Sequence, residues 1–159
     1  MRKEILIQSA SNLKQPGSEA LQEFEQKQDA MLAVINDRFK NRPDLDHLIG
    51  EGNLEMMMNN HHNHLRFMVS LFGSYSPDVL VETVLWVFRA YRTHGFRLAY
   101  WPAQLDVWVE IMKESLSEKC FRELYPFYQW MIVNNPVFAV LSDEVISGDS
   151  VHDAGKRHL

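Results

Sequence analysis

The sequence predicts an all-α fold. Apolar residues recur at intervals of three or four positions through most of the chain, which is the spacing of a buried helix face. Proline, glycine and serine interrupt this spacing where helices would begin and end, and no stretch alternates apolar with polar residues as a half-buried strand does. The 159 residues correspond to one domain. We expect a helical domain over residues 18–146, preceded by an N-terminal arm over residues 1–17 and followed by a flexible tail over residues 147–159.

The composition narrows the classes of function. The formal net charge is -5 at pH 7, which argues against a general nucleic-acid binder or a protein of anionic membranes, since both need a basic surface. Cys120 is the single cysteine, so we expect no internal disulfide and no cysteine-based zinc cluster. The sequence shows no signal peptide and no apolar run of the ~18 residues that would span a bilayer. These features predict a cytoplasmic protein.

The first predicted helix covers residues 18–40. Ser18 is a good N-cap residue and Glu19 suits the first turn, and the apolar positions that follow have helical spacing. Pro43 disfavours helical geometry at the residue before it, so the helix should end there. Residues 44–49 are expected to form one short turn.

The next two predicted helices cover residues 54–72 and 76–94. The first carries three histidines in its middle turns. The second opens on Ser76-Pro77-Asp78, which supplies a cap, a proline at the first helical position and an acidic residue, and Gly95 closes it. This second helix is apolar over more than half of its surface, which is typical of a central helix or of an interface.

Two further helices complete the prediction. One begins at Pro102, and Ser117 caps the last. Pro126 should kink this last helix, and the run Asn134-Asn135-Pro136 should end it. Residues 137–141 are then expected to pack back on the domain as a short apolar segment. The expected architecture is about six helices in two layers.

Three side chains of the helix over residues 54–72 are both polar and predicted to be buried. At ~100° per residue, His61 lies at the centre of the apolar face, and His64 and Asn60 lie on its flank. Two interpretations remain open. These residues are either core residues whose polar atoms find partners within the protein, or they line a ligand pocket. The second interpretation arises because buried imidazole and amide groups are costly unless a tetrapyrrole, a metal or water satisfies them.

Four short motifs occur in order between residues 60 and 114. They are HLRFMV at residues 64–69, GSYSPD at residues 73–78, Trp101-Pro102, and WVEIMK at residues 108–113. In this order, over roughly a third of the chain, the sequence resembles the central helices of phycobiliproteins, the globin-fold light-harvesting subunits. The resemblance implies a globin-like, phycobiliprotein-type fold in which these elements, Trp101 among them, border a bilin pocket.

Two positions depart from the family pattern. The family attaches its bilin through a cysteine, and the corresponding position here is Met57, which forms no thioether. The family usually holds the pyrrole nitrogens with an aspartate one turn later, and the same count reaches Asn60, with His61 beside it. Cys120 lies far away in sequence and is not assigned the attachment role. The chain is therefore similar to the bilin biosynthesis-associated globins, non-photosynthetic relatives that bind linear tetrapyrroles.

The resemblance implies non-covalent binding of a bilin, such as biliverdin, by a carrier, chaperone or sensor. Arginines would suit the bilin propionates, although solvated helix surface is the alternative for them. Bilin-metabolising enzymes are the protein partners that this hypothesis implies. The candidate binding residues are Met57, Asn60, His61, His64, Arg66, Arg89, Arg92 and Trp101.

Two alternative functions remain open. A haem-binding globin would use His61 and/or His94 on successive helices, since haem iron commonly takes histidine; His94 also suits a simpler interaction with the helix dipole. A ligand-free globin-like interaction module would use the apolar helix that carries Trp86. A homodimer is compatible with all three hypotheses.

The sequence does not predict an enzyme or a metal centre. His61 and His64 are three residues apart, but no Glu-x-x-His motif supplies further ligands for a zinc or di-iron site. The sequence contains no Gly-rich phosphate loop, no Gly-x-Ser-x-Gly elbow and no Cys/His nucleophile arrangement.

Overall fold

The computed structural model describes residues 2–151, and the side chains of residues 2–144. Within this range all the regular secondary structure is helical, which confirms the predicted all-α class. The helices are α1 (Arg2–Ala10), α2 (Ser18–Lys40), α3 (Leu45–Ile49), α4 (Leu54–Gly73), α5 (Pro77–Arg92), α6 (Tyr100–Ser115) and α7 (Glu118–Val151).

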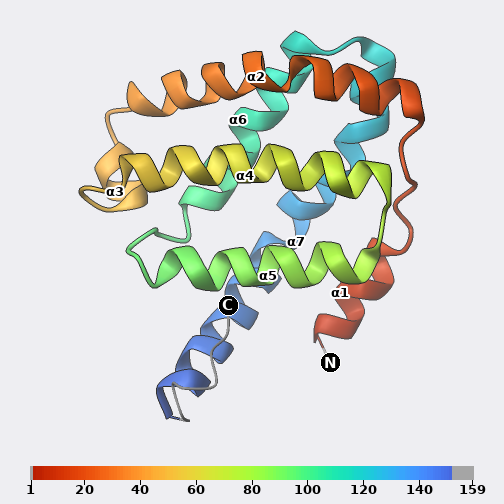
Figure 1. Cartoon of the computed structure of the whole chain (residues 1–159). Coiled ribbons are helices and arrows are strands. Elements are labelled where there is room, and N and C mark those ends of the chain that lie inside the picture. The colour runs from red at the N-terminus through yellow and green to blue at the C-terminus, as the bar shows by residue number, and fades with distance from the viewer. Residues whose placement is uncertain (1, 152–159) are drawn as a thin grey trace.

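The helices form two layers. In Figure 1, α2, α4 and α5 lie in front with successive helices running in opposite directions, and α6 and α7 cross behind them. Helix α2 packs against α4, α6 and α7, and α5 packs against α7. Aromatic rings connect helices within and between the layers: the ring centroid of Phe72 on α4 lies 5.4 Å from that of Phe24 on α2, in the same layer, and 5.1 Å from that of Phe127 on α7, in the other. Such edge-to-face pairs contribute beyond their buried area.

The segment expected to be an N-terminal arm contains a docked helix. Helix α1 packs against α5 and α7 and buries Leu6 and Ala10. Tyr75 Oη donates a hydrogen bond of 2.5 Å to the Ala10 carbonyl, and Trp130 Nε1 donates one of 2.9 Å to Ser9 Oγ. The sequence did not predict α1 because its apolar residues are few and lack a clear helical period.

Helix α7 is longer than predicted, and the predicted end at Pro136 is wrong. The helix continues through Pro126 and Pro136 to Val151. Phe138, expected in a separate apolar segment, is fully buried within α7, with its ring centroid 5.8 Å from that of Phe88 and 5.7 Å from that of Trp130. This packing offsets the ~3 kcal/mol that a proline costs inside a helix. Residues 147–151 of the predicted tail are therefore helical, and residues 152–159 lie outside the described residues.

The other predicted boundaries differ from the structure by a few residues. Helix α2 covers the predicted range, but its N-cap is Gly17, whose N–H donates to Glu123 Oε1 at 2.8 Å. Ser76 caps α5 as predicted, because its Oγ accepts from the Val79 N–H at 3.3 Å. Helix α6 begins at Tyr100, two residues before the predicted start at Pro102.

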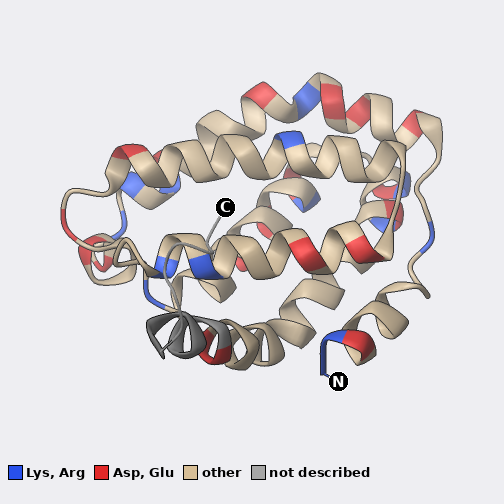
Figure 2. Ribbon diagram, turned by 60° about the horizontal axis from the view of Figure 1, so that its bottom comes forward, with Lys and Arg blue, Asp and Glu red and all other residues tan. Residues whose placement is uncertain are grey.

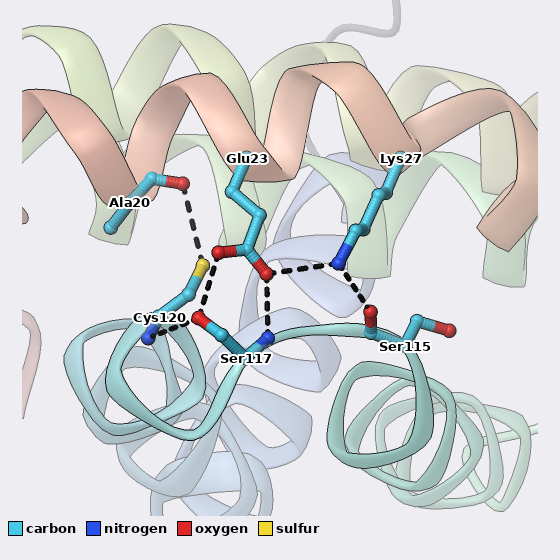
Figure 3. Close-up of polar contacts among 6 residues, drawn as sticks. All are labelled: Ala20, Glu23, Lys27, Ser115, Ser117 and Cys120. Carbon is cyan, nitrogen blue, oxygen red and sulfur yellow. Dashed lines mark hydrogen bonds and ion pairs between the residues drawn. The ribbon is translucent and has the colours of Figure 1, made fainter.

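Glu23 joins α2 to the loop between α6 and α7 (Figure 3). Its carboxylate accepts from Ser117 twice, from the backbone N–H at 2.5 Å and from Oγ at 2.7 Å. Lys27 Nζ donates to Glu23 at 3.1 Å and to the Ser115 carbonyl at 2.7 Å. The hydrogen bonds from Ser117 hold the pKa of Glu23 below its usual value. This contact fixes where α7 begins relative to α2.

None of the helices in residues 2–151 combines the length and the apolar character needed to cross a membrane.

Candidate functional site

A cavity of about 270 Å³ lies between α4 and α5, where α6 and α7 contribute the remaining lining residues. Two kinds of side chain dominate its chemistry. The aromatic ones are Phe67, Trp86, Phe88, Tyr91 and Trp101. The polar ones are Asn60, Asn63, His64, Thr83, Gln104 and Asn135. Its volume is close to the lower end of the range of small-molecule sites, ~300–1,000 Å³.

Aromatic rings of α5 and α6 stack along this cavity. The rings of Phe88 and Trp101 lie nearly parallel, with centroids 5.0 Å apart and an interplanar angle of 21°. Tyr91 meets the same Trp101 ring edge-on at 5.9 Å. These contacts between neighbouring helices hold the rings in fixed orientations. Since both stacked residues line the cavity, aromatic surface is available to a planar ligand there.

No Asp, Glu, Lys or Arg side chain of the described residues lines the cavity. Arg66 is exposed on α4. The charged residues of α5 are divided by sign along the helix, with Asp78 and Glu82 in its first half and Arg89 and Arg92 towards its end (Figure 2). Arg92 is engaged elsewhere, since its Nη1 lies 2.5 Å from Asp143 Oδ1 on α7. The predicted arginines therefore do not enter the cavity.

Asn60, Tyr100 and Gln104 form a buried hydrogen-bonded cluster at this cavity. Tyr100 Oη donates to Asn60 Oδ1 at 2.9 Å. Gln104 Nε2 donates to Tyr100 Oη at 2.7 Å and also to Asn60 Oδ1. Burial raises the pKa of Tyr100 well above its ordinary value, so its hydroxyl stays neutral. Asn60 and Gln104 are only 4% and 3% exposed, and both line the cavity.

His64 also lines the cavity, and residues of α6 and α7 hold its ring in place. Its Nε2 shares a hydrogen bond of 2.7 Å with Tyr128 Oη on α7, and its ring stacks on Trp108 with centroids 5.1 Å apart. Burial lowers the pKa of His64 from 6.5 to about 3. The imidazole is therefore neutral at pH 7 and acts as a hydrogen-bonding group without charge.

His61 lies on the core side of α4 and does not line the cavity. Its Nδ1 donates to Asn36 Oδ1 at 2.7 Å, so Nε2 is the unprotonated nitrogen. Nε2 is buried without a hydrogen-bond partner, and the rings of Phe39, Tyr100 and Trp108 surround the imidazole. Burial is the main cause that lowers the pKa of His61 to about 3, and the nearby His64 adds to it.

The structure divides the predicted site residues into three groups. Asn60, His64 and Trp101 line the cavity. Met57 and His61 are fully buried outside it. The three arginines do not line it. His94, the second haem-ligand candidate, is exposed just after α5, where its carbonyl accepts from Asn53 Nδ2 at 2.8 Å.

The hydrogen-bond partners of Asn60, His61 and His64 lie on other helices and were not predicted from the sequence. Gln104 could have been found, because it is a polar residue between Trp101 and Trp108 on the apolar face of the α6 helix. Tyr100 lies one turn before it, at the i, i+4 spacing that lets two helical side chains meet. Asn36 and Tyr128 gave no such indication, since their roles depend on which helix packs against α4.

Among the described residues, no three His, Cys, Asp or Glu side chains are grouped so that they could hold a metal ion. Comparisons of the chain with protein-family models, with curated proteins and with solved structures find no match.

Proposed function

We propose that this protein is a non-enzymatic, globin-like binding protein that holds a conjugated ligand of the linear tetrapyrrole class non-covalently between α4 and α5. The observation that carries the proposal is the cavity of about 270 Å³, with five aromatic side chains and uncharged polar groups in its lining. Sites of this kind, mostly apolar with a few placed polar groups, are typical of small-molecule binding. Carrier, chaperone and sensor are the roles compatible with such a site.

Two features favour a conjugated ligand over a flexible aliphatic one. Five aromatic side chains line the cavity, and such rings interact with an extended π-system through dispersion and quadrupole interactions. Met68 and Met131 add polarisable, adaptable surface. The neutral His64 and the amide groups supply hydrogen-bond partners for pyrrole or lactam groups.

The size and charge of the cavity constrain how a tetrapyrrole would sit. The volume suits one or two rings better than four, and no cation of the described residues lines the cavity to pair with a carboxylate. In the proposed arrangement one end of the bilin enters the cavity, and the propionates remain in water outside it. Desolvating a propionate without a cation would cost several kcal/mol.

Haem has less support as the ligand. His61 does not line the cavity and His94 is exposed, so these two histidines do not converge on it. His64 does line it, but its Nε2 is engaged with Tyr128 Oη. Iron coordination by that nitrogen would break this hydrogen bond and leave a buried tyrosine hydroxyl unpaired.

The test is an absorption titration of the purified protein with biliverdin and, separately, with hemin. We expect a saturable, red-shifted bilin band and no comparable hemin spectrum. Val84→Phe, which adds volume at a lining residue of α5, should abolish the bilin band. Val79→Phe on the same helix is the matched control, since Val79 is 50% exposed and does not line the cavity.

Two results would contradict the proposal. One is a flat response of the wild type to biliverdin. The other is equal binding by Val84→Phe and Val79→Phe, which would place the bilin at another surface of the protein.

A further inference from the structure

The amides of Asn60 and Gln104 have unused hydrogen-bonding capacity at the cavity. Asn60 uses Oδ1 to accept from Tyr100 and Gln104, and Gln104 uses Nε2 to donate. Asn60 Nδ2 and Gln104 Oε1 make no hydrogen bond with the described residues. Neither of these two unpaired atoms is fully buried. Since both residues line the cavity, these two atoms are left available to a ligand.

The unused pair is one donor and one acceptor whichever way the two amides are oriented. In the orientation described, Asn60 offers its N–H₂ and Gln104 its carbonyl oxygen. If both amides were turned over, Asn60 would donate within the cluster and Gln104 would accept, which would leave an oxygen on Asn60 and an N–H₂ on Gln104. In either case the two amides together offer one free donor and one free acceptor, and neither carries a charge.

We propose that Asn60 and Gln104 form a recognition site for the N–H/C=O edge of a neutral ring lactam. A lactam presents one N–H donor and one carbonyl acceptor, which match in kind the free acceptor and the free donor of the two amides. The aromatic lining of the cavity, which includes Phe88 and Trp101, suits the flat conjugated ring that would carry this edge. No charged side chain of the described residues lines the cavity, so the recognised part of the ligand is uncharged.

This inference deepens the proposed function and rests on the same cavity. The end rings of a linear tetrapyrrole are lactams, whereas a porphyrin has none. Recognition of a lactam edge would therefore select bilins over haem without using the propionates. It also assigns Asn60 a different role from the acceptor of pyrrole N–H groups expected from the sequence, because both lone pairs of its Oδ1 are engaged within the protein.

The experiment uses a small lactam that suits the size of the cavity. Isothermal titration calorimetry compares 2-quinolinone, a conjugated ring lactam, with N-methyl-2-quinolinone, which lacks the N–H donor. We expect 2-quinolinone to bind and the N-methyl compound to bind at least about tenfold more weakly, the loss expected for one hydrogen bond with a buried partner left unpaired. Equal binding of the two compounds, or binding of neither, would overturn the inference.

Two variants test the amides themselves. Gln104→Met keeps the length of the side chain and the hydrogen bond between Tyr100 and Asn60, and should weaken 2-quinolinone about tenfold. Asn60→Asp keeps an oxygen that can accept from Tyr100 and Gln104 but, when ionised, puts a charged carboxylate oxygen in place of the free N–H₂ donor, so it should also weaken binding of the neutral lactam. The control is Gln129→Met, since Gln129 is exposed on α7 and does not line the cavity. Unchanged affinity in both Gln104→Met and Asn60→Asp would overturn the inference.

Biliverdin separates the two proposals. If the wild type binds biliverdin and Gln104→Met binds it equally well, the lactam site fails and the proposed function stands. If the wild type binds 2-quinolinone through the amides but does not bind biliverdin, the lactam site stands and the tetrapyrrole ligand is wrong.

Discussion

His61 and His64 lie one turn apart on α4 and are both kept neutral, although their surroundings differ. His61 is enclosed by rings of α2 and α6, with Asn36 as its hydrogen-bond partner. His64 lines the cavity and bonds to Tyr128 of α7. Burial lowers the pKa of each from 6.5 to about 3. Both side chains therefore link the stability of the fold to pH.

We predict that the protein loses stability as the pH falls below about 6.5. In the unfolded chain both histidines take up a proton near their ordinary pKa of 6.5, whereas in the folded protein they stay neutral down to about pH 3. The stabilisation is complete above the unfolded pKa and is lost on acidification, by up to about 1.4 kcal/mol per pH unit for each histidine. Urea unfolding at pH 7, 6, 5 and 4 measures this slope.

Variants of single histidines test which residue causes this dependence of stability on pH. His61→Gln should remove about half of the acid-dependent loss, whatever its effect on stability at pH 7. His62→Gln should leave the slope unchanged, because His62 is exposed on the same helix. A slope that His61→Gln does not change would mean that His61 is protonated in the folded protein.

At this scale the sequence predicts burial better than contacts. The helical wheel correctly places Asn60 and His61 in buried positions, because the period of 3.6 residues is a local property. The wheel does not predict that His64 lines the cavity whereas His61 packs in the core. That separation depends on which helices cover each flank of α4, and sequence spacing within one helix contains no information about it.

At the scale of elements, a single carboxylate ties the start of α7 to α2. Glu23 accepts both hydrogen bonds of Ser117 and one from Lys27. Its lowered pKa means that the stabilisation is present above the unfolded pKa of Glu23 and is lost as the pH falls through the lower folded value.

We predict that Glu23→Gln lowers the free energy of unfolding by about 1–2 kcal/mol at pH 7. The amide keeps one acceptor oxygen, but its N–H₂ faces donors, and the charge-assisted bonds are lost. Chemical denaturation measures the change. Glu25→Gln on the same helix is the control, since Glu25 is exposed and should change stability by less than about 0.5 kcal/mol. Equal effects of the two variants would show that the Glu23 contact does not stabilise the fold.

Helix boundaries show which local signals are decisive. Ser76-Pro77-Asp78 marks the start of α5 correctly because the cap hydrogen bond is made within four residues. Pro136 misleads because its local cost is outweighed by the burial of Phe138 between Phe88 and Trp130. A local signal predicts a boundary when its energy is not exceeded by packing against distant segments.

At the scale of the whole molecule, α1 completes the packing beside α5 and α7. Leu6 is 2% exposed, whereas its neighbour Ile5 is 59% exposed, so one side of a short helix carries the contact. The all-α class and most of the helices follow from the sequence. The docking of α1 does not, because it depends on surfaces that form only after the other helices have packed.

We predict that Leu6→Ala lowers the free energy of unfolding by about 2–4 kcal/mol, as expected when a buried leucine is truncated in a packed core. Ile5→Ala should cost less than about 0.5 kcal/mol, because its side chain is largely exposed. Urea denaturation of both variants gives the comparison. A cost for Leu6→Ala as small as that for Ile5→Ala would mean that the first helix does not dock.

The thiol of Cys120 can report when α2 separates from α7. Cys120 is 2% exposed beside Glu23, and its Sγ contacts the Ala20 carbonyl at 3.4 Å across the same junction (Figure 3). Burial is the main cause that raises its pKa to about 11, which leaves almost no nucleophilic thiolate in the closed molecule. An alkylating reagent can therefore trap the sulfur only when α2 separates from α7. With one cysteine in the chain, the labelling rate counts these separations directly and without an introduced probe.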